Sequence, residues 1–426
     1  MLVYRAEAAS VNILFIGPFG LSPKYTVSGR ALPLARALAR RGHQVRLLIP
    51  PWDHPTDSGR RITVDGVQVE HIVLPRLLPG IAHVLIVWRL LRQAVWSNAD
   101  IIHVFKPKGY SGAVALVLWY LRRLRIIRAR VVVDTDDWEG WGGWNERGGY
   151  HPLAKRVFAW QERWGLVCCD AVTAASQTLQ SLAWSLGARR VCHVPNGLLE
   201  PVVLPPNRGL KTAAYETNLP PGVGLTALIY TRFVEIAPEH LAAIVSALLN
   251  RMADIGVLVL GAGPADELQR FRQCLAHAGN RGEQPDTSSF DTLGPTHRVR
   301  ILGWVQAADL LQYWALADVG LFPCEDNQLT RAKSPLRLVE MMAAGLPIVA
   351  HRVGEVEHYV ENRVSGLLVP AGDDEEFVNA VAELASSAEL RRLLGTQARQ
   401  RVKRDFSWHH LTTQVEALYQ EIVDLS

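Results

Sequence analysis

Cysteine is scarce in this sequence and follows no recognisable pattern. Five cysteines occur among 426 residues. Their number is odd, they form no Cys-x-x-Cys pair, and no histidine cluster stands at zinc spacing. We therefore expect neither a disulfide framework nor a metal site, and we expect a reducing compartment.

Long hydrophobic runs are also missing. No segment approaches 18 uninterrupted apolar residues, so we expect no membrane-spanning helix. The first residues show no basic region followed by a long apolar run, and we interpret the short stretch 11–17 as a buried strand rather than a signal peptide. Together these absences predict a cytoplasmic protein.

An excess of charge of one sign is absent as well. The formal net charge is only +4, whereas a nucleic-acid-binding domain is usually strongly basic, so we expect no nucleic-acid partner. Hydrophobic residues make up 49% and charged residues 20% of the chain, which is typical of a globular protein. The length suits two domains of about 200 residues each.

Two apolar segments, 81–96 and 113–130, are edged with arginine and tryptophan. One interpretation is that each is a helix covering a sheet, with a solvated basic end. The other is that they form a face resting on an anionic membrane, where a lipid-linked acceptor would be found. The second interpretation would make the protein peripheral at the inner face of the membrane.

Short strands rich in Val and Ile alternate with helical segments in both halves of the chain, which predicts an α/β fold of two doubly wound parallel sheets. A Pro-, Gly- and Asn-rich stretch at 195–224 separates the halves. We expect the ligand site where the carboxyl ends of the two sheets meet, in an interdomain cleft. The strands are predicted at 12–16, 44–49, 101–105, 130–134, 171–174, 225–230, 257–260, 299–302, 319–322 and 347–350, with helices at 28–41, 373–404 and 408–424.

The segment around residue 334 carries a predicted anion site. Ser334 is expected as the N-cap of a helix and Pro335 as its first residue. A helix N-terminus presents backbone N–H groups to a diphosphate, and Lys333 and Arg337 flank it. Glu340 lies further inside, where its carboxylate would accept hydrogen bonds from ribose hydroxyls. The alternative is an ordinary capped helix in which Arg337 and Glu340 form a pair.

The segments 340–349 and 364–369 resemble the donor-binding signature of glycosyltransferase family 4, a family of retaining enzymes with the GT-B fold. The resemblance covers nearly the whole chain. It implies two facing Rossmann-like domains, an acceptor-binding domain at 1–200 and a nucleotide-sugar-binding domain at 221–405, with the last helix, 406–426, packing back on the first. It further implies transfer of a sugar from a nucleoside-diphosphate sugar to a hydroxyl with retention, without a metal or other cofactor. The acceptor is left open as a sugar, a lipid-linked glycan or a small molecule.

The resemblance fails at two positions, Ala332 and Ala237. The first Glu of the family motif should stand eight residues before Glu340, where this chain has Ala332. Glu325 or Asp326 is a candidate to replace it, although both are also interpreted as capping a loop.

The diphosphate-binding cations are likewise only partly matched. Arg232 corresponds to the arginine of the family, but the expected lysine is Ala237, so Lys333 or Arg337 is the predicted replacement. The glycine turn at Gly263 also fits the family. The expected donor-binding residues are Arg232, Lys333, Ser334, Leu336, Arg337, Glu340 and Gly263, with Ser334 and Leu336 donating backbone N–H groups.

Carboxylates and tryptophans follow the predicted strand at 130–134. Family members carry a catalytic-site histidine near Asp136, and we expect Asp136 or Asp137 to orient the acceptor hydroxyl or accept its proton. Trp138 would stack on a sugar face or on lipid. The alternatives are a divalent metal held by Asp134, Asp136 and Asp137, and a loop that only packs.

The glycine-containing loop after the first strand lacks the Gly-x-Gly-x-x-Gly spacing of dinucleotide-binding enzymes, which disfavours a dehydrogenase. Lys106, at the end of another strand, is a candidate for holding an anionic acceptor. The expected acceptor-binding residues are Ser28, Gly29, His103, Lys106 and Trp138. Two other functions stay open: a sugar-nucleotide epimerase with the same fold, and a non-catalytic relative that binds a nucleotide sugar or a partner protein.

Overall fold

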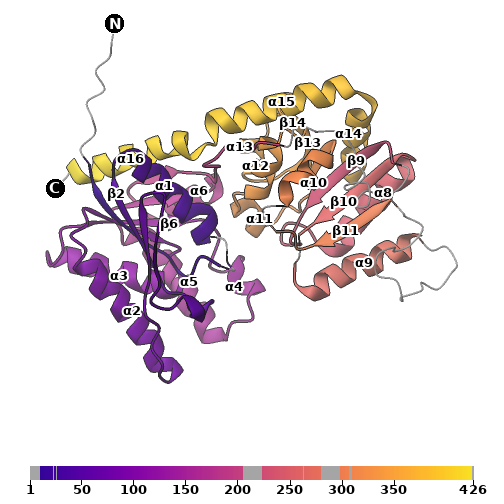
Figure 1. The fold of residues 1–426 in the computed structure, drawn as a ribbon. Helices are drawn as coiled ribbons and strands as arrows, with labels where there is room; N and C mark the ends of the chain where they lie inside the picture. The colour runs from indigo at the N-terminus through magenta and orange to yellow at the C-terminus, as the bar shows by residue number, and fades with distance from the viewer. Residues whose placement is uncertain are drawn as a thin grey trace, which may run out of the picture. The chain divides into compact units, whose positions relative to one another are not determined.

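The computed structural model describes residues 10–22, 24, 26–204, 223–261, 263–279, 298–306 and 309–424. They form two compact units (Figure 1). The first contains Met1–Leu199, Ala332–Ser334 and Ser407–Ser426, and the second contains Glu200–Arg331 and Pro335–Phe406. The last helix, α16 (Trp408–Asp424), therefore belongs to the first unit.

The first unit is built on an eight-stranded sheet with the order β3-β4-β2-β1-β5-β6-β7-β8. Every neighbouring pair is parallel except the β3–β4 hairpin. The order reverses between β1 and β5, and such a reversal opens a crevice at the carboxyl ends of the strands. The strands are β1 Asn12–Ile16, β2 Gln44–Ile49, β3 Arg61–Val64, β4 Val67–His71, β5 Ile101–Phe105, β6 Arg130–Thr135, β7 Ala171–Ala174 and β8 Val191–His193.

Both faces of this sheet are covered, because successive strand residues point to opposite sides. Ile13 and Phe15 pack with α1 and α16 in one core, whereas Leu14 and Ile16 pack with α2, α3, α5 and α6 in another. The helical segments are η1 Val27–Ala31, α1 Leu32–Arg40, η2 Pro55–Asp57, α2 Pro79–Val95, α3 Gly109–Arg123, α4 Trp144–Arg147, α5 Pro152–Val167 and α6 Gln177–Leu186.

The second unit has a six-stranded parallel sheet with the order β11-β10-β9-β12-β13-β14, which reverses between β9 and β12. The strands are β9 Leu225–Tyr230, β10 Ile255–Leu260, β11 Val299–Gly303, β12 Val319–Phe322, β13 Ile348–Arg352 and β14 Gly366–Pro370. The helices are α8 Pro238–Arg251, α9 Ala265–Gly279, α10 Leu310–Leu316, α11 Gln328–Ala332, α12 Leu336–Ala343, α13 Val356–Tyr359, α14 Asp374–Ser386 and α15 Ala388–Asp405.

The predicted α/β class with two parallel sheets is confirmed, and each predicted strand is present. The strands β3, β4, β8 and β14 were not predicted. The single helix predicted at 373–404 is wrong: Ser387 ends α14 and caps α15, its side chain accepting a hydrogen bond from the Leu390 N–H. The helix predicted at 28–41 begins instead with the π-helical turn η1. Among the described residues, no helix is both long enough and apolar enough to cross a membrane.

Candidate active site

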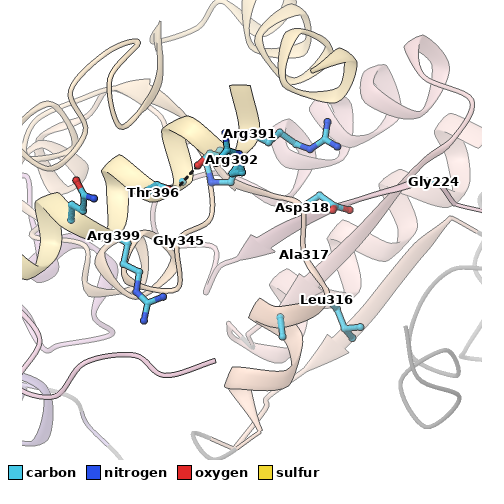
Figure 2. A pocket seen from close by; sticks show the side chains of 13 residues that line it. Gly224, Leu316, Ala317, Asp318, Gly345, Arg391, Arg392, Thr396 and Arg399 are labelled. Carbon is cyan, nitrogen blue, oxygen red and sulfur yellow. Dashed lines mark hydrogen bonds between the residues drawn. The ribbon is translucent and has the colours of Figure 1, made fainter. Parts of the chain in front are cut away.

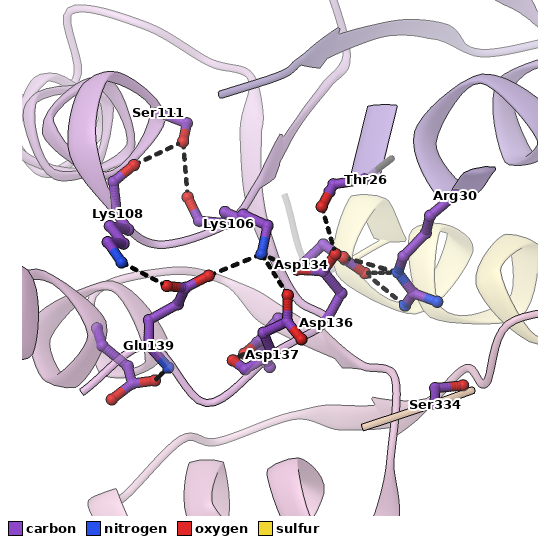
Figure 3. A network of polar contacts seen from close by, with 12 residues as sticks. Thr26, Arg30, Lys106, Lys108, Ser111, Asp134, Asp136, Asp137, Glu139 and Ser334 are labelled. Atoms are coloured by element: carbon purple, nitrogen blue, oxygen red, sulfur yellow. Dashed lines mark hydrogen bonds and ion pairs between the residues drawn. The ribbon is translucent and has the colours of Figure 1, made fainter. Parts of the chain in front are cut away.

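A lysine lies among three carboxylates at the carboxyl edge of the first sheet (Figure 3). The Lys106 Nζ is 3.1 Å from Asp136 Oδ1, 2.6 Å from Asp137 Oδ2 and 2.7 Å from Glu139 Oε1. Lys108 Nζ is 2.8 Å from the other oxygen of Glu139. Although burial alone would lower the pKa of Lys106, the charges of Asp136, Asp137 and Glu139 raise it well above the ordinary value. Lys106 is therefore a cation held within the edge of the sheet.

The backbone at Lys106 adopts a conformation that is unusual for a residue with a side chain. Its φ is +63°, in the left-handed region that residues other than glycine rarely occupy. The Lys106 N–H donates to the Asp134 carbonyl at 3.0 Å, which extends the β5–β6 ladder by one residue. Strain of this kind persists where the surroundings over-determine it, and it is concentrated at functional sites.

Asp136 and Asp137 are neighbours with different electrostatic environments. Burial raises the pKa of Asp136 to about 6, against the opposing charge of Lys106. The pKa of Asp137 lies below its ordinary value, because the charges of Lys106 and Lys333 outweigh its burial. The Thr26 hydroxyl donates to Asp136 Oδ2 at 2.8 Å. This separation makes Asp136 the better proton acceptor of the two near neutral pH.

The sequence left open a divalent metal held by Asp134, Asp136 and Asp137, but in the structure the third carboxylate beside Asp136 and Asp137 is Glu139, while Asp134 pairs with Arg30. One oxygen of each of Asp136, Asp137 and Glu139 lies within 4.8 Å of the others, a spacing at which a cation could be held. In the structure the Lys106 ammonium contacts all three, at 3.1, 2.6 and 2.7 Å, and so supplies that positive charge. Lys333 also contributes, and its Nζ lies 5.5 Å from the centre of the Trp144 ring.

Asp134 is fully buried and forms a structural ion pair. Arg30 Nη2 lies 2.6 Å from Asp134 Oδ2, and both side chains are almost completely inaccessible. The Thr173 hydroxyl also donates to this carboxylate, at 2.6 Å. Asp134 consequently anchors η1 to the end of β6 and is not available to substrate.

His103 does not lie where an acceptor could reach it. It is fully buried, with Nδ1 2.6 Å from the Tyr419 hydroxyl and Nε2 3.0 Å from the Thr173 hydroxyl. Burial lowers its pKa to about 4. We therefore correct its expected role: His103 joins β5 to α16 and β7, because its position inside the strand directs it into the core.

The remaining residues expected at the acceptor lie at or beside this edge. Ser28 and Gly29 are half-buried in η1, two and three residues after Thr26. Trp138 is half-buried, and its indole N–H donates to the Trp141 carbonyl at 2.9 Å. The tryptophan thus also holds its own loop together.

Sequence reasoning missed four residues of this network: Thr26, Arg30, Glu139 and Glu162. Glu162, on α5, accepts a hydrogen bond from the Glu139 N–H at 2.6 Å, and burial raises its pKa to about 7. Nothing in the sequence links positions 139 and 162, since only the packing of α5 brings them together. Glu139 stands two residues after Asp137, and this short spacing could have indicated that it belongs to the same carboxylate cluster.

The second unit places its cations at the β9–β12 reversal. Arg232 follows β9 and is exposed. Arg337, in the first turn of α12, lies 3.7 Å from Glu235 Oε1 and over the ring of Tyr230. Burial raises the pKa of Glu340 to about 7, while the charge of Arg337 lowers it.

The glycine turn after β10 lies against the Arg232 loop. A Cβ on Gly263 would stand 2.6 Å from the Arg232 carbonyl oxygen. A Cβ on Gly261, whose φ is +100°, would stand 1.9 Å from the Thr231 carbonyl oxygen. Only glycine permits this approach, so the turn fixes the backbone of the loop that carries Arg232.

The expected N-cap of α12 is wrong. The helix begins at Leu336 with Pro335 as its N-cap residue, and no side chain caps it. The Ser334 hydroxyl instead accepts a hydrogen bond from the Asn196 N–H at 2.8 Å, and the Ser334 carbonyl accepts another from the Asn196 side chain, also at 2.8 Å. Ser334 therefore belongs to the framework of the first unit.

The position of the missing motif carboxylate is filled by a packed alanine. Ala332 is fully buried with Ala174, Ala175 and Leu179. The proposed replacements are already engaged: Glu325 accepts a hydrogen bond from the Ala237 N–H at 3.0 Å, and Asp326 forms an ion pair with Arg331. The interpretation that these two carboxylates cap and brace loops agrees with these contacts.

A pocket of about 670 Å³ lies elsewhere in the second unit (Figure 2). Its lining includes Gly224, Asp318 and Pro347, which directly precede β9, β12 and β13, together with Arg392 and Thr396 of α15. It thus opens at the amino ends of the strands, whereas Arg232 follows the carboxyl end of β9. None of the expected donor residues lines it.

Two family models match the chain in sequence. Residues 27–197 match the "Glycosyl transferase 4-like domain", and residues 227–387 match "Glycosyl transferases group 1". The chain belongs to glycosyltransferase family 4.

Two curated relatives align with this glycosyltransferase over most of its length at low identity. It is 23% identical to a phosphatidyl-myo-inositol mannosyltransferase of Mycobacterium leprae over 97% of each chain. It is 24% identical to a GDP-mannose-dependent alpha-mannosyltransferase of Corynebacterium glutamicum, over 94% of this chain and 86% of the relative. A match of 31% identity to a D-inositol 3-phosphate glycosyltransferase of Saccharomonospora viridis spans only 43% of this chain and 40% of the relative.

Solved structures share the fold of this glycosyltransferase. One is the catalytic domain of starch synthase IV from Arabidopsis thaliana, bound to ADP and acarbose. It aligns with a TM-score of 0.72 at 16% identity, and the alignment covers 98% of this chain and 100% of the starch synthase domain. An Anabaena protein in complex with UDP-glucose aligns with a TM-score of 0.67 at 17% identity, over 96% of this chain and all of that one. The predicted GT-B fold is thereby confirmed.

Proposed function

We propose that this enzyme transfers a hexosyl group from a nucleoside-diphosphate sugar to an acceptor hydroxyl with retention of configuration, and that it needs no metal. The bond between the anomeric carbon and the diphosphate breaks, and a bond from that carbon to the acceptor oxygen forms. The acceptor proton passes to Asp136, and the nucleoside diphosphate leaves. The observation that carries the proposal is the Asp136–Asp137–Lys106 cluster, in which one carboxylate has a pKa of about 6.

The donor is assigned to the second unit. Arg232 and Arg337 stand at the sheet reversal, where ligands bind in doubly wound folds, and their charges suit a leaving diphosphate. Glu340 lies one turn further along α12 from Arg337 and is assigned to the ribose. Solved structures of the same fold are described in complex with ADP and with UDP-glucose, which supports a nucleotide donor.

The acceptor is assigned to the first unit and is proposed to be lipid-linked. Support comes from a relative that is named for phosphatidyl-myo-inositol and aligns over 97% of each chain. We accordingly propose a cytoplasmic enzyme in peripheral contact with the membrane.

A second candidate is a non-catalytic relative that binds a nucleotide sugar. It is favoured by one observation: the motif carboxylate is replaced by Ala332, which is fully buried in an apolar cluster.

The first experiment is a thermal-shift screen with UDP, GDP, ADP, dTDP and CMP, with and without magnesium. A ligand at about 100 times its Kd raises the free energy of unfolding by roughly 2.7 kcal/mol. A stabilising diphosphate would identify the donor base for a transfer assay. If none stabilises the protein, the donor site as assigned is wrong.

The transfer assay then separates enzyme from binding protein. Asp136→Asn should lose turnover but keep nucleotide binding, whereas Glu340→Gln should weaken nucleotide binding. Asp65→Asn is the matched control in the first unit and Glu383→Gln in the second, since both carboxylates form exposed ion pairs. An unmodified protein that binds the diphosphate but transfers no sugar would support the second candidate.

A further inference from the structure

One helix of the first unit carries an apolar stripe on its outer side. On α5 the residues Leu153, Val157, Trp160, Trp164 and Val167 recur at intervals of three and four, which places them on one side of the helix. All five are exposed, Leu153 by 64% and Trp160 by 46%. The side of α5 that contributes Leu166 to the core is a different one. The stripe is therefore not required for packing against the sheet.

The neighbouring helices carry similar exposed residues. Within α2, the side chains of Ile81, Val84 and Trp88 are more than half exposed, and Trp96, which caps its end, is 80% exposed. Further exposed apolar residues are Val117 and Tyr120 on α3, Leu124 at its end, and Trp184 on α6.

These helices are adjacent to one another. α2 contacts α3, α3 contacts α5, and α5 contacts α6, and all four cover the same face of the first sheet. We call their outer surface the helical face. Most of the large apolar side chains that are exposed in the described part of the chain lie on it or directly at its helix ends. Exposed apolar surface on this scale marks an interaction site.

The charges of the helical face have one sign. The four helices contain a single carboxylate, Glu162, which is buried. Their exposed cations are Arg92, Arg123, Arg156 and Arg163. Two of these arginines lie over tryptophan rings, Arg92 over Trp88 and Arg123 over Trp119. A second copy of the same face would oppose arginine to arginine, so a partner of negative charge is favoured.

We propose that the helical face rests on an anionic lipid bilayer, with the tryptophans among the acyl chains and the arginines at the phosphates. This deepens the membrane contact that forms part of the proposed function. Tryptophan and arginine are the residues that suit the boundary between hydrocarbon and head groups. The sequence indicated only the segments 81–96 and 113–130, whereas the structure adds α5 and α6.

The helical face is continuous with the carboxylate cluster. α3 begins at Gly109, directly after Lys108, and the Lys108 Nζ lies over the rings of Tyr150, just before α5, and Phe158, within it. A lipid held at the helical face would thus carry its head group to the edge of the sheet where Lys106 and Asp136 lie.

The test is cosedimentation of the full chain with vesicles of phosphatidylcholine alone or mixed with phosphatidylglycerol, at low salt. We expect binding to the mixed vesicles and little to the neutral ones. Arg156→Gln/Arg163→Gln should weaken the partition coefficient about thirtyfold, because each basic side chain near an anionic surface contributes about fivefold. Trp160→Ser/Trp164→Ser should weaken it at least as much. The matched control is Trp304→Ser, an exposed tryptophan of the second unit, which should bind like the unmodified protein.

Three results would overturn the proposal: no binding to the anionic vesicles, equal binding to both kinds, or an equal loss in the Trp304→Ser control. If the tryptophan variant instead converts a dimer to a monomer in sedimentation velocity without changing vesicle binding, the helical face is an interface between copies. The experiment uses neither donor nor turnover, so its failure is distinct from a failure of the proposed function, which the nucleotide screen reports.

Discussion

The two units present opposite electrostatics at equivalent edges of their sheets. In the first unit, the cations at the β1–β5 reversal are engaged by carboxylates, with Lys106 held by three of them. In the second unit, the β9–β12 reversal carries Arg232, which is exposed, and Arg337, which lies at 3.7 Å from Glu235. In the proposed function, the edge of the first sheet serves a neutral hydroxyl and proton transfer, and the edge of the second sheet binds a diphosphate. The comparison indicates that fold sets the place of each site and side chains set its substrate.

The largest expected effect comes from removing the central cation of the first edge. Lys106→Met leaves three carboxylates close together and largely buried, and breaking such a buried pair costs about 3–5 kcal/mol. We expect the free energy of unfolding in urea to fall by this amount. Lys403→Met, at an exposed position on α15, should have little effect.

A rescue variant sharpens this test. Adding Asp137→Asn and Glu139→Gln to Lys106→Met should restore part of the lost stability, since fewer charges are then left unpaired. If the single variant is as stable as the unmodified protein, the interpretation that Lys106 compensates the charges of the three carboxylates is wrong.

The next largest effect concerns Arg232, at the β9–β12 reversal of the second sheet. Arg232→Ala should weaken binding of the nucleoside diphosphate about 10- to 100-fold, because a hydrogen bond to a charged group contributes about 1.5–3 kcal/mol. Calorimetric titration measures it. Arg270→Ala is the control, since Arg270 is an exposed arginine of the same unit on α9. Equal losses in both variants would show that only overall charge matters.

Much of the fold was predictable because its signals are local. The Val- and Ile-rich strands and the glycines that end helices, such as Gly42 with φ +96° and Gly345 with φ +76°, stand in continuous segments. The networks at the edges were not predictable in the same way. Lys106 meets Asp136 only because Phe105 pairs with Asp134 in the β5–β6 register. Ser334 illustrates the opposite error: its sequence suits a helix cap, but tertiary contacts with Asn196 use its hydroxyl.

A smaller effect concerns Glu162, a carboxylate at the edge of the first sheet that forms no ion pair with any residue that the structure describes. Burial raises the pKa of Glu162 from about 4.5 to about 7. The folded protein therefore binds this proton more tightly than the unfolded chain, and stability from this group is lost as the pH rises through 7. The difference between these two pKa values corresponds to about 3 kcal/mol, so Glu162→Gln should be more stable than the unmodified protein at pH 8 by at most this amount.

The same comparison at low pH is the internal check. Near pH 4.5 the Glu162 side chain is neutral in the folded protein and only half ionised in the unfolded chain, so the gain from Glu162→Gln should be almost absent there. Glu146→Gln, at an exposed position on α4, is the control. A gain from Glu162→Gln that is constant between pH 4.5 and 8 would contradict the raised pKa.

The smallest expected effect is a pH dependence of nucleotide affinity that arises from Glu340, in the second unit, whose sheet edge we call the donor edge. Burial raises the pKa of Glu340 to about 7, and only the ionised carboxylate accepts hydrogen bonds from both ribose hydroxyls. Nucleotide affinity should therefore rise about tenfold between pH 6 and pH 8, since one pKa unit corresponds to a factor of ten. A terminal phosphate also titrates near this range, so the quantity to measure is the ratio of affinities of the unmodified protein and Glu340→Gln at each pH. A ratio that grows with pH assigns the dependence to Glu340, because the variant shares the titration of the ligand. A constant ratio would remove Glu340 from the ribose and leave the arginines alone to define the donor edge.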